Sequence, residues 1–214
     1  MIKQPLLEAF GYRKAGYPLE PLQAERLAAY LRLVIEYNKQ INLVRYTTEE
    51  EFVLLHGLDF LPLLADPSPA PLVDLGAGAG FTGVPLAICR PGRTTYLLEP
   101  NIRRGFFLNL VKGRLDLNYE VVPRDLEGAL PSLPDADLVF AARALPKKER
   151  VFRRLHAAWP HPHRLALFLG ADADAFLGDL RLWYAVDRMI EMPFRENGRL
   201  ALLHNVSRET WAVS

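Results

Sequence analysis

Residues 72–81, LVDLGAGAGF, decide the fold of this chain of 214 residues. The first four form a short apolar run that enters a glycine turn, which is typical of a buried strand. Three glycines within five residues let the chain turn sharply and let a ligand approach the backbone without a Cβ in the way. Because ligands of parallel sheets bind beyond the carboxyl ends of the strands, we expect a binding site at this turn.

Strands alternate with helices after the turn. The sequence predicts further strands at residues 94–98, 119–122, 137–141 and 164–169, and helices at 84–90, 103–115 and 146–159. This alternation indicates an α/β fold with a mostly parallel sheet covered on both faces. Two late strands, 184–189 and 200–206, have no helix between them, so we expect an antiparallel pair at the C-terminal end.

The residues before the turn are helical in pattern. A helix is expected from Pro21 to about Asn38, and a second one that begins at Thr47 and continues through residue 63. The segment 66–71, DPSPAP, cannot continue a helix, because its three prolines remove donors and fix φ. We therefore predict an N-terminal helical extension over residues 1–65 and an α/β domain over 66–214.

Composition excludes several classes of protein. The net charge is +1, so any surface for nucleic acid must be local. Cys89 is the only cysteine and the five histidines are scattered, so neither a disulfide nor a metal site is expected. The chain has neither a secretory leader nor about 18 consecutive apolar residues, which favours a cytosolic protein without a membrane span. We expect a monomer.

The glycine turn fits two cofactors. In one register, Gly76-x-Gly78-x-Gly80 follows Asp74, as in sites for S-adenosylmethionine. In the other, residues 78–83 match the dinucleotide fingerprint. Asp74 suits the cationic sulfonium and would repel a pyrophosphate, so we favour S-adenosylmethionine. Glu99 lies at a suitable spacing for the ribose hydroxyls of either cofactor. A dinucleotide and a turn that binds nothing remain alternatives.

Four further motifs of the chain resemble those of one protein family. YNKQINL at 37–43, HGLD at 56–59, GVPL at 83–86 and Arg90-Pro91 follow one another in the order seen in one family. From about residue 20 to 205 the chain resembles RsmG, also called GidB, the bacterial methyltransferases of small-subunit (16S) ribosomal RNA. The resemblance implies a Rossmann-like methyltransferase fold, S-adenosylmethionine as methyl donor, ribosomal RNA as partner and N7 of a guanine as acceptor.

The resemblance also implies roles for single residues. Gly76 and Phe81 would contact the cofactor, Glu99 would hold its ribose, and Asp125 and Leu126 would frame the adenine. Arg143 would match an arginine at the edge of the family's active site. Asn42, His56 and Asp59 would match motif positions in the helical extension. His56 and Asp59 are three residues apart on one helix face; they either reach the active site or, as we favour, tie the extension to the α/β domain.

Three positions depart from the family pattern. Thr82 stands where the family usually has proline, Ala142 replaces a common serine, and Leu169 stands where a lysine is usual. These departures leave the glycine turn intact. The absence of the usual lysine at position 169, however, removes a positive charge near the substrate and puts the identity of the RNA target in question. Another RNA or a small molecule therefore remains an alternative substrate, and a non-catalytic ribosome-associated protein remains an alternative function.

The chemistry of the acceptor limits what Arg143 can do. Guanine N7 has a free lone pair and no proton, so transfer needs positioning and no general base. An arginine bidentate to O6 and N7 would block the nucleophile. We expect Arg143 to bind a phosphate, O6 alone or the cofactor carboxylate.

A basic segment is the second candidate for contact with RNA. Residues 143–164 carry seven lysines and arginines against one acid, Glu149. This local charge of +6 predicts a phosphate-binding patch, although such runs are also common on solvated helix faces. The candidates for RNA contact are Asn42, His56, Arg103, Arg104, Lys147 and Lys148.

Overall fold

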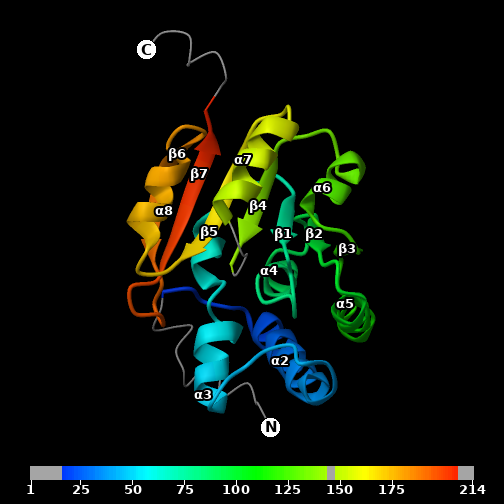
Figure 1. Cartoon of the computed structure of the whole chain (residues 1–214). Coiled ribbons are helices and arrows are strands. Elements are labelled where there is room, and N and C mark those ends of the chain that lie inside the picture. The colour runs from blue at the N-terminus through cyan, green and yellow to red at the C-terminus, as the bar shows by residue number, and fades with distance from the viewer. Residues whose placement is uncertain (1–15, 144–147, 207–214) are drawn as a thin grey trace.

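The structure, a computed structural model, describes residues 16–143 and 148–206 and contains one mixed sheet (Figure 1). The strand order is β3-β2-β1-β4-β5-β7-β6. The bounds are β1 (Leu72–Leu75), β2 (Thr95–Leu98), β3 (Glu120–Val122), β4 (Leu138–Ala142), β5 (His163–Leu169), β6 (Tyr184–Glu191) and β7 (Arg199–Asn205). The first five strands are parallel, and β7 is antiparallel to both β5 and β6. The predicted α/β fold with an antiparallel C-terminal strand is confirmed, with strand starts within one residue.

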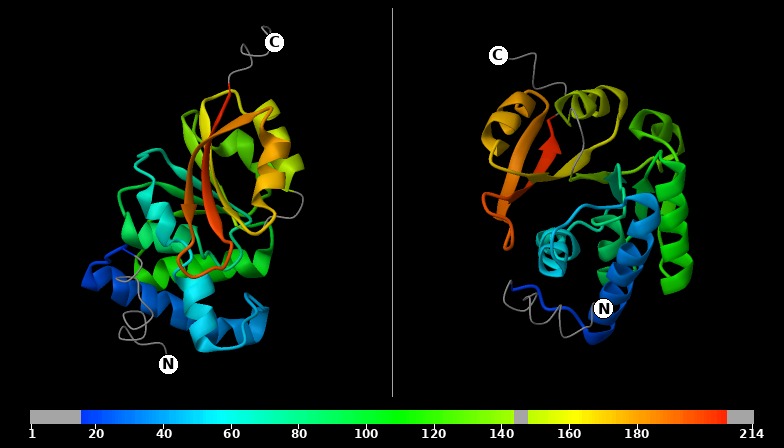
Figure 2. Two further views of the ribbon diagram at one scale, coloured as in Figure 1. Left: turned by 90° about the vertical axis from the view of Figure 1, so that its left-hand side faces the viewer. Right: turned by 60° about the horizontal axis from the view of Figure 1, so that its bottom comes forward.

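Helices cover both faces of the sheet (Figure 2). One face carries α4 (Gly83–Cys89) and α5 (Ile102–Leu115), and the other carries α6 (Leu126–Ala129), α7 (Lys148–Ala158) and α8 (Ala173–Leu180). Successive strand residues enter different clusters: Phe140 packs with Phe152 of α7, whereas Val139 packs with Leu63 and Leu86. Such burial on both faces explains why the strands are continuous apolar runs. No helix in the described part of the chain is long and apolar enough to cross a membrane.

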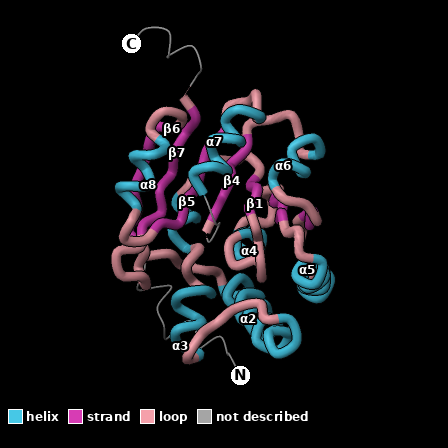
Figure 3. The backbone as a smooth tube through the Cα atoms, in the orientation of Figure 1, coloured by secondary structure: helices cyan, strands magenta, loops and turns pink. Residues whose placement is uncertain are grey.

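Strand β1 lies in the interior of the sheet, between β2 and β4 (Figure 3). From β1, the strands β2 and β3 extend the sheet toward one edge, and β4 and β5 extend it toward the other. Beyond the carboxyl ends of β1 and β4, the loops therefore diverge and leave space for a ligand. The glycine turn follows β1 at this point.

The first helix that the structure describes, α2 (Pro21–Ile41), crosses beneath this region (Figure 1). Pro21 occupies the first turn, and Glu20 and Gln23 form a capping box. Its buried residues, spaced three and four apart, pack against α4 and α5. The helix continues three residues beyond the expected end because Asn42, in the left-handed region at φ 47°, provides its C-cap.

The prediction of one continuous helix through residue 63 is wrong. The chain forms α3 (Glu49–Phe52), a π-helical turn η1 (Val53–Gly57) and a 3₁₀ turn η2 (Leu61–Ala65). Thr48 is the N-cap, one residue later than expected. A Cβ on Gly57 would lie 2.7 Å from Cδ1 of Leu31, so this segment needs glycine to approach α2. The π turn changes the direction in which His56 and Asp59 project.

Short helices were not foreseen. The four-residue α6 and the 3₁₀ turn η3 (Leu130–Ser132) are too short to show a periodic pattern, and α8 lies in a segment to which no element was assigned. None of them changes the sheet order.

Gly83→Ala is expected to lower the free energy of unfolding by about 1–3 kcal/mol, because its Cβ would overlap Cδ2 of the fully buried Leu97. Urea unfolding measures the change. Gly113→Ala is the matched control, since nothing outside the local chain of helix α5 lies within 4 Å of the Cβ that it would add, and alanine favours a helix. A Gly83→Ala protein as stable as wild type would contradict this account of α4 packing against β2.

Candidate functional site

The carboxyl ends of β1, β4 and β5 open into a cavity of about 570 Å³. The glycine turn forms one wall, and the helical extension, which lies below the sheet in Figure 1, forms the facing wall. Lining residues come from the extension (Leu43, Val44, His56, Asp59), from the ends of β4 and β5 (Arg143, Leu169, Gly170) and from the β6–β7 loop (Met192, Arg195). Segments far apart in the sequence therefore build one site.

The turn has the backbone geometry that its glycines allow. Gly76, Gly78 and Gly80 have φ values of +67°, +61° and +90°, in the region that L side chains rarely adopt. A Cβ on Gly80 would also lie 2.5 Å from Cγ2 of Val84. From the extension, the buried hydroxyl of Tyr30 donates to the Ala79 carbonyl at 2.9 Å. The turn is thus fixed by both its own geometry and α2.

Asp74 holds the start of α4. Its Oδ2 accepts from the Gly83 N–H at 2.9 Å, and burial raises the pKa of its carboxyl to about 7. A pyrophosphate at this turn would need free N–H groups at the helix start, but Asp74 already occupies one of them. The geometry therefore favours a cationic ligand over a dinucleotide.

Glu99 lies beneath the turn at the end of β2. Its Oε2 accepts from the Gly78 N–H at 2.7 Å and its Oε1 from the Asn101 N–H at 2.8 Å. The residue is 4% exposed. Each carboxylate oxygen can accept a second hydrogen bond, so Glu99 can shape the turn and still receive two ribose hydroxyls.

A second cavity of about 270 Å³ lies on the other side of Gly76. Leu75, Leu98 and Leu126 give it apolar walls, and Asp125 lies at its edge. Asp125 also caps α6, because its Oδ1 accepts from the Gly128 N–H at 3.0 Å. Glu127, one residue later, lines the same cavity and pairs with Arg154. Apolar walls with a polar edge suit a flat heteroaromatic ring such as adenine.

Arg143 lies just beyond β4 and reaches into the first cavity. Its Nη2 lies 2.8 Å from Asp59 Oδ2, donates to the Leu55 carbonyl and is 3.3 Å from His56 Nδ1. The guanidinium carbon is 5.6 Å from the ring centre of Phe81, a cation–π contact. Arg143 is therefore held by the extension and by the turn at once.

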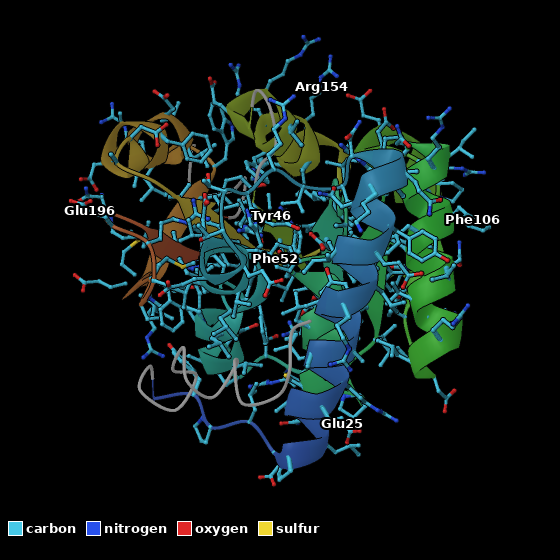
Figure 4. The ribbon with its side chains drawn as sticks, turned by 90° about the horizontal axis from the view of Figure 1, so that it is seen from below. Glu25, Tyr46, Phe52, Phe106, Arg154 and Glu196 are labelled. Carbon is cyan, nitrogen blue, oxygen red and sulfur yellow. The ribbon has the colours of Figure 1, made fainter. Side chains whose placement is uncertain are left out.

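His56 is uncharged at neutral pH. Burial, with the guanidinium groups of Arg143 and Arg195, lowers the pKa of its imidazole to about 4. Because arginine only donates, Nδ1 accepts, and the ring proton belongs on Nε2. Its ring lies 5.1 Å from that of Phe81, which also packs on Phe52. Phe52 is labelled in Figure 4 next to Tyr46, whose ring it also contacts. His56 thus acts as a neutral part of the wall rather than as a cation for phosphate.

Arg195 is a charged residue of the cavity that the sequence analysis missed. It lies in the loop between β6 and β7, and its Nη2 donates to Asp59 Oδ2 at 2.9 Å and to the Leu55 carbonyl at 3.2 Å. Asp59 therefore joins two arginines, and its buried Oδ1 has no hydrogen-bond donor among the described residues. The pair spans 136 positions, and a single arginine in a polar loop carries no local signal.

The structure brings together only part of the predicted set. The first cavity is lined by Asp74, Gly76, Gly78, Phe81, His56, Arg104 and Arg143, whereas Gly80 and Glu99 support the turn from beneath. Asn42 is exposed and caps α2, and Arg103 is exposed on α5 without lining the cavity. Lys147 lies outside the described residues, and of Lys148 only the backbone, at the start of α7, is described.

The predicted basic patch is not one surface. Arg164 lies at the opposite end of the sheet from Arg143 and lines a separate cavity with Asp66 and His204. On α7, Arg153 pairs with Glu149, and Arg154 pairs with Glu127. Helix α7 takes the chain from the carboxyl end of β4 to the amino end of β5, so the two ends of the segment lie far apart and the local sum of +6 does not describe one patch.

Comparison with known proteins identifies relatives. The family model described as rRNA small subunit methyltransferase G (GidB) matches residues 23–170. The ribosomal RNA small subunit methyltransferase G of Pseudomonas syringae pv. syringae is 38% identical over 133 residues, 62% of each chain. The protein of the same name from Ectopseudomonas mendocina is 41% identical over 128 residues, 58% of this chain and 59% of the relative. The chain thus matches about three fifths of the length of these relatives.

Solved structures share the fold at low identity. A variant of MtNAS has a TM-score of 0.60 and 17% identity, covering 94% of this chain and 86% of its own. A putative methyltransferase, yhhF, from Escherichia coli has a TM-score of 0.54 and 13% identity, covering 78% and 91%. At these identities the likeness concerns the fold alone.

Proposed function

This chain belongs to the GidB family, rRNA small subunit methyltransferase G, and we propose that it uses S-adenosylmethionine to methylate N7 of a guanine in small-subunit (16S) ribosomal RNA. The observation that carries the proposal is the cavity in which the glycine turn, with Asp74 beside it, faces Arg143 and Arg195, which Asp59 of the helical extension holds in place. Because its proposed substrate is ribosomal RNA, we expect the protein to act in the cytoplasm.

The two cavities on either side of Gly76 match the two ends of S-adenosylmethionine. Leu98, Leu126 and Asp125 would hold the adenine, and Glu99 the ribose. Asp74 would face the cationic end in the larger cavity. When bound, the cofactor supplies an electrophilic methyl group on a sulfonium.

The acceptor side of the cavity needs no base. Guanine N7 presents a lone pair, so the residues around it have only to place the base in line with the methyl group. Arg143 uses Nη2 for Asp59 and Leu55, which leaves Nη1 and Nε for O6 or for a phosphate. Phe81 and the neutral His56 offer an apolar surface beside it.

Cofactor affinity is expected to rise with pH through about 7, because Asp74, with its pKa raised to about 7 by burial, must ionise to attract the cation. Binding a cation favours the ionised form, so affinity is low below pH 6 and levels off above pH 8. Calorimetry between pH 6 and 8.5 measures the change.

Asp74→Asn is the control for this pH dependence, because asparagine can still accept from the Gly83 N–H but does not titrate. We expect the residual pH dependence in this variant to reflect the ligand's own amino group only. Equal pH profiles for wild type and Asp74→Asn would contradict the role of Asp74.

The methylated atom can be identified from the product. Small-subunit RNA treated with the protein and S-adenosylmethionine, then digested to nucleosides, should contain one additional 7-methylguanosine by mass spectrometry. Methylation at an exocyclic amine or a ribose hydroxyl would overturn the N7 proposal. Methylation only of another RNA or of a small molecule would leave the methyl donor in place and replace the acceptor.

A further inference from the structure

We propose that Arg195 binds a phosphate of the RNA backbone at the mouth of the cavity and so sets the position of the target nucleotide. This inference rests on the proposed function. It assigns a role in RNA binding to Arg195, which no sequence pattern had indicated.

The first argument is depth. Arg143 and Arg195 bind the same Asp59 oxygen, yet their side chains are 16% and 38% exposed. Arg143 is thus the inner and Arg195 the outer of the two. A base that enters the cavity leaves its charged backbone near the solvent, because burying a phosphate is costly. The outer arginine is therefore the one that meets a phosphate.

The second argument is the supply of donors. Arg195 uses only Nη2 for Asp59 and Leu55, and among the described residues Nη1 and Nε have no hydrogen-bond partner. A guanidinium has five N–H donors in a fixed plane, three of them on these two nitrogens. The N–H groups of Nη1 and Nε point to different sides of the guanidinium, so either nitrogen can donate a charge-assisted hydrogen bond to a phosphate oxygen while Nη2 stays on Asp59.

The third argument is charge. Arg143 and Arg195 share one carboxylate, that of Asp59, and His56 beside them is neutral at pH 7. The cluster therefore carries a net charge of +1 at the wall facing the turn. The neighbouring wall is apolar at Leu169, which is 4% exposed, so the charge that can attract an anion is on the arginines.

The fourth argument is preorganisation. The β6–β7 loop is closed by hydrogen bonds from the Met192 N–H to the Gly198 carbonyl and from the Gly198 N–H to the Arg195 carbonyl, both at 2.9 Å. Asp59 and the Leu55 carbonyl then fix the guanidinium from the other side of the cavity. A donor held in place before binding loses less conformational entropy when the phosphate arrives.

The test is the salt dependence of binding to small-subunit RNA. For Arg195→Ala, the slope of log K against log salt concentration should fall in magnitude by about 0.7–0.9, the contribution of one phosphate contact. KM for the RNA should rise about tenfold or more, while kcat at saturating RNA and the affinity for S-adenosylmethionine stay within about twofold. Arg195→Lys keeps the charge but loses the planar guanidinium that can hold Asp59 through one nitrogen and donate through the others, so its slope should stay as in wild type while KM rises.

Arg188→Ala is the matched control, because Arg188 lies on β6 of the same hairpin but lines a separate cavity. Its slope and KM should equal those of wild type. An Arg195→Ala slope equal to that of wild type, in a preparation that methylates the RNA, would overturn the assignment of Arg195 alone. A wild-type protein that neither binds nor methylates small-subunit RNA would overturn the proposed function and this assignment with it.

Discussion

Glu99→Ala is expected to weaken S-adenosylmethionine binding by about a hundredfold or more. The substitution removes the acceptor of the Gly78 N–H, which shapes the turn, and of the Asn101 N–H, which precedes α5. It also removes the proposed acceptor of two ribose hydroxyls. Hydrogen bonds to a charged group contribute about 1.5–3 kcal/mol each, so the loss of two corresponds to roughly two to four powers of ten in affinity.

Calorimetry with S-adenosylmethionine and S-adenosylhomocysteine measures this loss. Both ligands contain the same ribose, so both should lose affinity to a similar extent. Glu120→Ala, an exposed acid at the start of β3, is the control and should bind as wild type. Binding by a folded Glu99→Ala protein within threefold of wild type would remove Glu99 from the cofactor site.

Arg143→Ala is expected to reduce methyl transfer by a factor of about 10²–10³. Groups that place and stabilise a reacting centre contribute on this order, and Arg143 is the inner cation of the cavity. Cofactor affinity should change only a few-fold, because the residues beneath the turn stay in place. Stability should fall far less than activity, because Arg195 still neutralises the buried Asp59.

Single-turnover transfer to small ribosomal subunits, at saturating cofactor, separates these effects. Arg150→Ala changes an exposed arginine of α7 and should transfer at the wild-type rate. Unchanged transfer by a folded Arg143→Ala protein would exclude Arg143 from the mechanism.

The sheet could be predicted because its information is local. Apolar runs of four to six residues predicted β1 to β5 within one residue at their starts, and the runs of β1, β2 and β4 are each followed by a helical pattern. The glycine turn was equally readable, since its positive φ angles demand glycine and Asp74 precedes it by two positions. Local sequence thus determined the cofactor side of the site.

The acceptor side depends on contacts that no local pattern contains. Asp59 meets Arg195 across 136 positions, and the π turn at 53–57 forms where Gly57 approaches Leu31 of another helix. Helical periodicity extended α3 too far because tertiary packing, and not propensity, ends it. The prediction of one basic patch over residues 143–164 was wrong for the same reason, because helix α7 places Arg143 and Arg164 at opposite ends of the sheet.

The most direct test of the account is transfer of a labelled methyl group from S-adenosylmethionine to purified small ribosomal subunits that lack the modification. The account predicts incorporation into the small-subunit RNA that approaches one methyl group per subunit with wild type. With the Glu99→Ala protein, at a cofactor concentration near the wild-type Kd, it predicts a much lower initial rate. No incorporation by a folded wild-type protein that binds S-adenosylmethionine, with either assembled subunits or their free RNA, would contradict it.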